Sequence, residues 1–65
     1  MKELTQEKRR MMAAVTRNAM EEVLGAEGEG GDFDDAERYL RDDVSDNELW
    51  FEFEKWTKLE SRLRT

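Results

Sequence analysis

The sequence predicts a small all-α domain of three helices. Apolar residues recur at spacings of three and four in three separate segments, and each of those segments opens on a residue that favours a helix N-cap. The chain has no Pro, and its four Gly residues all fall within residues 25–31. The predicted helices span roughly residues 5–24, 32–43 and 46–63. We expect residues 1–65 to form one domain in which the last two helices make a tight corner (32–63) and the first is tethered through a flexible linker at 25–31.

The first predicted helix has a local signal at each end. Thr5 is a suitable N-cap, and Gly25 stands in the position just past the helix end that favours glycine. At 100° per residue, six apolar residues gather on one face: Leu4, Met11, Met12, Val15, Ala19 and Val23. Met20 and Leu24 lie on a different side, so the sequence predicts that the last turns are contacted from two directions.

The charges of this helix oppose its macrodipole. Lys8, Arg9 and Arg10 occupy its early turns, where positive charge is unfavourable. We therefore expect the helix to need packing against the rest of the chain or against another copy. The same three residues with Arg17 form a weak signal for phosphate binding, because no aromatic residue is interleaved with them. Direct binding of nucleic acid is accordingly not expected.

The second predicted helix begins with a run of Asp residues. Asp32 is its predicted N-cap, and Asp34 and Asp35 in its first turn suit the positive end of the dipole. Four apolar residues then recur at helical spacing: Phe33, Ala36, Leu40 and Val44. Tyr39 lies beside this stripe.

The third predicted helix starts at the clearest local motif in the chain. Ser45 and Glu48 have the spacing of a capping box, and Val44 and Leu49 have the spacing of a hydrophobic staple. The motif predicts that Val44 belongs to the stripe of the second helix and also fixes the entry into the third. The corner between the two helices follows from this shared residue.

Four of the six aromatic residues of the chain lie between positions 50 and 56. A helix places the largest set of apolar residues on one face here: Leu49, Phe53, Trp56, Leu59 and Leu63. Trp50 lies at the edge of that face and Phe51 nearly opposite it. Two interpretations stay open for this pair: Trp50 shields the margin of the core while Phe51 packs under the linker or the first helix, or both extend a second apolar patch that binds another protein.

Composition sets limits on stability. A chain of 65 residues buries only about 60% of the surface that it exposes when unfolded, so its stability is marginal. The absence of Cys and His excludes disulfides and the usual Cys/His zinc sites. Self-association is one remaining source of stability, and we expect the domain to be oligomeric.

Charge is unevenly distributed along the chain. The total is −6, with +3 over residues 1–20, −10 over residues 21–50 and +1 over residues 51–65. The acidic middle argues against direct contact of that segment with phosphates. It is consistent with a solubilising surface.

Catalytic, metal and membrane motifs are not found in the sequence. The Asp run fails the EF-hand pattern, because a calcium loop that started at Asp32 would place Glu37 where glycine is required. No hydroxyl has an evident catalytic base, so we expect a protein that is not an enzyme and that needs no cofactor. Without a signal peptide or an apolar run long enough to span a bilayer, we expect it to be soluble and cytoplasmic.

The stretch VSDNEL, residues 44–49, resembles a segment of the Hha-type modulators of nucleoid proteins, which are also small and helical. The resemblance covers about six positions, and capping chemistry selects most of them independently. No residue role is carried over from it.

The function predicted from these features is non-enzymatic binding of another protein, with self-association, through an aromatic helix surface. The residues predicted to bind the partner are Trp50, Phe51, Tyr39, Met20 and Leu24. The alternative is an acidic mimic of nucleic acid, such as a phage-type inhibitor of nucleic-acid machinery. Its surface would comprise Asp32, Asp34, Asp35, Asp42, Asp43 and Asp46.

Overall fold

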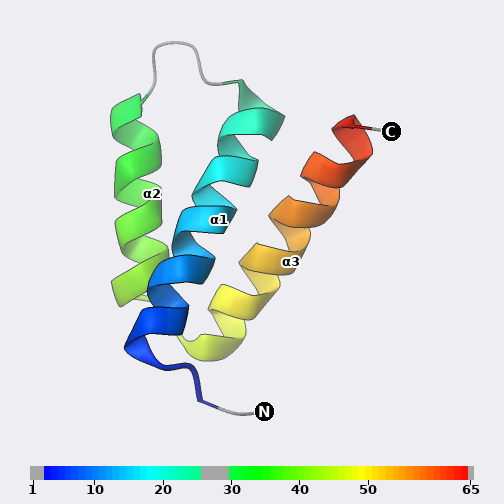
Figure 1. The fold of residues 1–65 in the computed structure, drawn as a ribbon. Helices are drawn as coiled ribbons and strands as arrows, with labels where there is room; N and C mark the ends of the chain where they lie inside the picture. Colours follow the sequence, from blue (N-terminus) through cyan, green and yellow to red (C-terminus); the bar gives the residue numbers. More distant parts are fainter. Residues whose placement is uncertain (1–2, 26–29, 65) are drawn as a thin grey trace.

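Three α-helices account for nearly all of the chain that the structure describes. The structure is a computed structural model that describes residues 3–25 and 30–64, with the side chains of residues 30–32 left out. Helix α1 spans Gln6–Leu24, α2 spans Gly30–Asp42 and α3 spans Asp46–Leu63 (Figure 1). The described residues include no β-strand, and the predicted all-α class with three helices is confirmed.

The start of α2 differs from the prediction. The helix begins at Gly30, so Asp32 is its third residue rather than its N-cap. Gly30 and Gly31 thus belong to the helix and not to a linker. The prediction of a flexible linker otherwise falls on residues 26–29, which lie outside the described residues.

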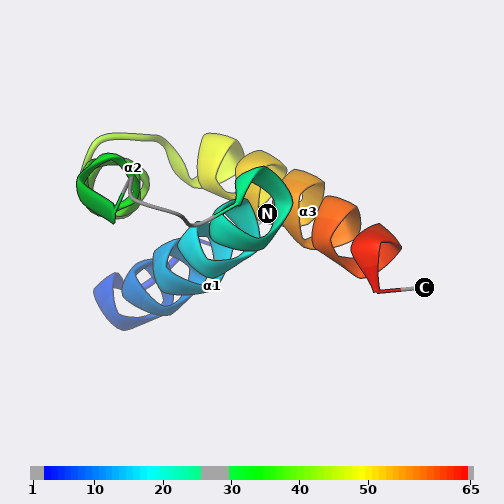
Figure 2. The same cartoon turned by 90° about the horizontal axis from the view of Figure 1, so that it is seen from above.

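Helix α1 is the central helix of the fold. It packs against both α2 and α3, whereas α2 and α3 make few contacts with each other. Figure 1 shows α2 running antiparallel to α1, while α3 runs in the same general direction as α1, and Figure 2 shows that α1 and α3 cross at an angle. The predicted corner exists as a short connection at residues 43–45, but the helices that it joins pack against α1 rather than against each other.

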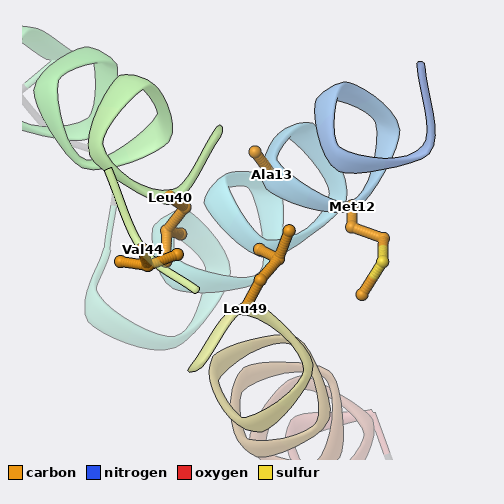
Figure 3. Close-up of a cluster of buried hydrophobic side chains, with 5 residues drawn as sticks. All are labelled: Met12, Ala13, Leu40, Val44 and Leu49. Atoms are coloured by element: carbon orange, nitrogen blue, oxygen red, sulfur yellow. The ribbon is translucent and has the colours of Figure 1, made fainter. Parts of the chain in front are cut away.

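Side chains from all three helices meet in one buried cluster near the N-terminal half of α1. Met12 and Ala13 from α1 contact Leu40 of α2, Val44 of the connection and Leu49 of α3 (Figure 3). The staple predicted for Val44 and Leu49 is confirmed, since both side chains are buried there. The cluster is small, as expected for so short a chain.

The buried face of α1 agrees with the predicted one only in part. Met12 and Ala19 of the predicted stripe are buried, but Met11 and Val15 are exposed, and Ala13 and Thr16, which the prediction left out, are completely buried. The prediction followed the largest apolar side chains. The structure instead places small residues where two helices approach α1 closely. The buried Thr16 hydroxyl is satisfied because it donates to the Met12 carbonyl at 2.7 Å.

Local capping signals are confirmed at both long helices. The Thr5 hydroxyl accepts from the Lys8 amide at 3.1 Å, and the Ser45 hydroxyl accepts from the Glu48 amide at 3.2 Å. Gly25 ends α1 with φ 85°, a conformation that favours glycine, and its amide donates to the Glu21 carbonyl. These bonds satisfy backbone groups that have no partner inside the helices.

The Arg9 side chain joins α1 to the connection between the other two helices. Its Nε donates to the Arg41 carbonyl oxygen at 2.9 Å, and its two terminal nitrogens donate to the Val44 carbonyl oxygen and to Asp46 Oδ1. The second oxygen of Asp46 accepts from the Leu4 amide at 2.9 Å. One guanidinium, 13% exposed, thus holds the end of α2 and the start of α3 against α1.

Candidate functional site

The main apolar depression in the described part of the molecule is a groove between α2 and α3, referred to below as the interhelical groove. Its volume is about 210 Å³. Its apolar lining comes from all three helices and consists of Met20, Ala36, Tyr39, Leu40 and Trp56. Glu48 and Glu52 of α3 complete it.

The groove exists because α2 and α3 pack on α1 without closing on each other. The Cα radius of gyration is 11.7 Å, compared with about 10.7 Å expected for a compact domain of this length. The smallest dimension of the molecule is 15 Å, so the three helices form a thin and open arrangement. The space between α2 and α3 is therefore not filled by their own side chains and forms the groove.

Side chains at the groove differ sharply in exposure. Leu40 is 4% exposed and lies at the base, whereas Tyr39 is 56% exposed and forms the rim on α2. Met20 is half-buried and packs against the core cluster. A buried base with an exposed aromatic rim suits the insertion of an apolar side chain from another molecule.

Trp56 forms the opposite wall and is held in place by its neighbours. Its indole Nε1 donates to Glu52 Oε1 at 2.9 Å, one turn earlier on α3. The Lys55 ammonium lies 5.2 Å from the centroid of the Trp56 ring, within the range of a cation–π contact. The ring is consequently oriented before any partner arrives.

The five residues predicted to bind a partner fall into three places. Tyr39 and Met20 both line the interhelical groove. Trp50 is half-buried against the core cluster and makes an edge-to-face contact with Phe53, with ring centroids 5.9 Å apart. Phe51, on the outer side of α3, and Leu24, at the end of α1, are each 61% exposed and do not line the groove. The structure thus brings two of the five together and adds Trp56, which the sequence pattern had assigned to the core.

Most residues of the predicted acidic surface are engaged with arginines. Asp34 pairs with Arg17 at 2.9 Å, Asp35 with Arg38 at 3.1 Å and Asp42 with Arg41 at 2.9 Å. Asp46 pairs with Arg9. Asp43 is exposed and has no ion pair among the described residues, while the side chain of Asp32 lies outside them. A continuous array of unpaired carboxylates, which a phosphate mimic needs, is therefore interrupted by internal cations.

The pair formed by Arg41 and Asp42 illustrates this. The hydrogen bond from Arg41 holds the pKa of the Asp42 carboxyl below its ordinary value of 3.8, and the same contact raises the pKa of Arg41.

A larger depression of about 360 Å³ on α2 is lined by charged residues alone: Asp34, Asp35, Glu37, Arg38 and Arg41. Each of these charges has an opposite charge within the chain.

Two members of the predicted basic patch also have structural roles. Arg9 holds the connection between α2 and α3, as described above. Arg17 lies within 3.5 Å of carboxylate oxygens of Glu21, Asp34 and Glu37, so it links α1 to α2. Lys8 and Arg10 are exposed.

Among residues 3–25 and 30–64, no group of three or more carboxylates is arranged to hold a metal ion. None of the three described helices combines the length and the apolarity needed to cross a bilayer.

No known family model matches the sequence, and no curated protein or solved structure is significantly similar to it.

Proposed function

We propose that the protein is a non-enzymatic interaction module that binds a protein helix or extended segment in the interhelical groove. The observation that carries the proposal is the convergence of Met20, Tyr39 and Trp56 from three different helices around one apolar depression. Exposed aromatic side chains beside a buried base are typical of binding hot spots.

The size of the groove supports a side-chain anchor rather than a small-molecule ligand. Pockets for drug-sized ligands usually have volumes of about 300–1,000 Å³. A dry apolar cavity of about 150 Å³ holds a benzene ring, so about 210 Å³ suits one aromatic or leucine side chain. The affinity would then come from that anchor together with contacts along the rim.

Site-specific photocrosslinking tests the proposal. Tyr39 is replaced by p-benzoylphenylalanine, the full-length protein is irradiated in an extract of its host, and adducts are identified by mass spectrometry. We expect a protein adduct at this position. The matched control is the same replacement at Phe51, an aromatic residue of similar exposure outside the groove. Absence of an adduct at Tyr39, or the same adducts at both positions, would contradict the proposal.

A further inference from the structure

We infer that the occupant of the interhelical groove is the second half of α3 from another copy of the chain, so that two copies pair antiparallel through α3. This inference rests on the proposed function, because it assigns a partner to the same groove. It follows from three features of α3: a second half that is only partly covered, a stripe that continues from the groove to Leu59 and Leu63, and an opposite charge at its two ends.

The second half of α3 is only partly covered within its own chain, since Leu59 is half-buried and Leu63 is exposed. In the described part of the molecule, Leu49 in the first turn is the only fully buried residue of this 18-residue helix. Leu63 in the last turn is 59% exposed, and in the view of Figure 1 the C-terminal end of α3 lies apart from α1, to which Arg64 still pairs through Glu22 at 3.0 Å. Because helices in proteins are stabilised mainly by packing of their apolar face, residues 57–63 are the part of α3 that gains most from a partner.

One stripe along α3 connects this partly covered end to the groove. Glu52 and Trp56, which line the groove, are followed by Leu59 and Leu63 at spacings of three and four. Residues at these spacings lie on one helical face. In an antiparallel pair centred on residues 55–56, Leu59 of each copy would lie opposite Glu52 of the other, next to its Trp56 wall, and Leu63 would lie opposite Glu48, so both leucines reach the lining of the groove. Such a two-fold interface closes on itself and uses the same surface twice.

Charge determines the direction of the pairing. At the groove end, Asp43 and Glu48 make no ion pair with a cation of the described residues, in contrast to the paired carboxylates of α2. The opposite end of α3 carries Lys58, Arg62 and Arg64. An antiparallel pair centred on residues 55–56 places Glu48 of one copy opposite residues 62–64 of the other. A parallel pair would instead bring like charges together, which is unfavourable.

Charge reversal at two positions provides the test. The purified full-length protein, Glu48→Arg, Arg62→Glu and a one-to-one mixture of the two variants are compared by sedimentation velocity from low micromolar to submillimolar concentration. We expect the wild type to be a dimer and each variant alone to dissociate with a Kd about 100-fold higher, since both symmetry-related pairs become repulsive. In the mixture, both pairs regain opposite charges, and dimers should form again. Circular dichroism establishes that each variant is folded.

A control variant and several outcomes make the result decisive. Phe51→Ser removes an exposed aromatic side chain outside the stripe and should leave the dimer intact. A monomeric wild type, a dimer that resists both charge reversals, or a mixture that stays monomeric would overturn the inference. A Tyr39 photoadduct with a different protein would overturn it while leaving the proposed function standing.

Discussion

The guanidinium of Arg9 donates to two carbonyl oxygens, that of Arg41 at the end of α2 and that of Val44 in the connection. Carbonyl groups at the end of a helix lack an amide partner within the helix. It also neutralises the Asp46 carboxylate, which is 28% exposed. Partly buried groups of this kind depend on one another, because loss of one leaves the rest without a partner. The charge pattern of the sequence placed Arg9 in a basic patch. The structure shows that its side chain instead holds the three helices together.

Arg9→Met should lower the free energy of unfolding by about 2–4 kcal/mol, since it leaves one carboxylate and two carbonyl oxygens without their donor. Urea denaturation followed by circular dichroism measures the change. The matched control is Arg10→Met, which changes an exposed neighbour and should have an effect within about 0.5 kcal/mol. Equal effects of the two substitutions would show that the bonds of Arg9 contribute little.

Acid should weaken the contact between Arg41 and Asp42. The pKa of Asp42 is lower in the folded protein than its ordinary value of 3.8, with the hydrogen bond from Arg41 as the main cause. The stabilising contribution of the contact is therefore present above about pH 3.8 and is lost as the pH falls through the lowered pKa. Arg41→Gln should raise the pKa of Asp42 toward 3.8, as measured by carbon-detected NMR titration. An unchanged titration in Arg41→Gln would exclude the contact as the cause.

At the level of elements, each long helix is defined by a local cap and a buried face. Thr5 and Ser45 satisfy amides in the first turns of α1 and α3, so the starts of these helices depend on residues close in sequence. The buried face of α1 depends instead on distant segments, because Ala13, Thr16 and Ala19 are buried where other helices pack. For α1 and α3, the sequence pattern therefore predicts where the helix starts better than it predicts the buried face of the central helix.

Ser45→Ala should lower the free energy of unfolding by about 1 kcal/mol, because the Glu48 amide loses its acceptor. Thermal or urea denaturation detects a change of this size in so small a domain. Ser45→Asp keeps a side-chain oxygen at the N-cap and adds favourable charge near the helix start, so its stability should stay close to that of the wild type. If both variants are equally destabilised, the effect does not arise from capping.

At the level of the whole molecule, the fold depends on α1, since each of the other helices packs mainly on it. All three helices contribute to one cluster of buried side chains, and Leu49 is completely buried in it. Of the buried apolar residues that the structure describes, only Ala19 and Phe33 lie outside this cluster. The three helices are therefore expected to unfold together.

Leu49→Ala should lower the free energy of unfolding by about 2–5 kcal/mol and leave a protein close to its folding limit. In the wild type, helix content and tryptophan fluorescence should report the same midpoint in urea, although both tryptophans lie on α3. An earlier fluorescence transition would show that α3 detaches while the other helices persist. That outcome would contradict a single cooperative unit.

Much of the fold follows from local residues, and the part that does not involves long-range contacts. The buried positions of Phe33, Leu40 and Val44 agree with the predicted stripe of α2. The central position of α1 could not be derived in the same way, because it depends on which faces of helices distant in sequence pack together. The hydrogen bonds of Arg9, which join residues 32 to 37 positions apart, are likewise long-range contacts that the sequence pattern does not predict.

The candidate site was predictable in part. Tyr39 and Met20 were singled out because they lie off the main apolar stripes, and both line the interhelical groove. The sequence pattern did not predict that Trp56 would line the groove, because its helical spacing placed it on the core face of α3. A groove between two helices appears only once their shared neighbour is known, and residue spacing does not supply this information.

The central position of α1 also affects the order of events during synthesis. This helix leaves the ribosome before α2 and α3, yet its apolar face is covered only by segments that are translated later, the last of them beginning at Asp46. Its charges do not favour an isolated helix either, because Arg9 and Arg10 stand near its start. Most of the chain must therefore emerge before stable structure can form, and until then the nascent segment is a potential substrate for chaperones.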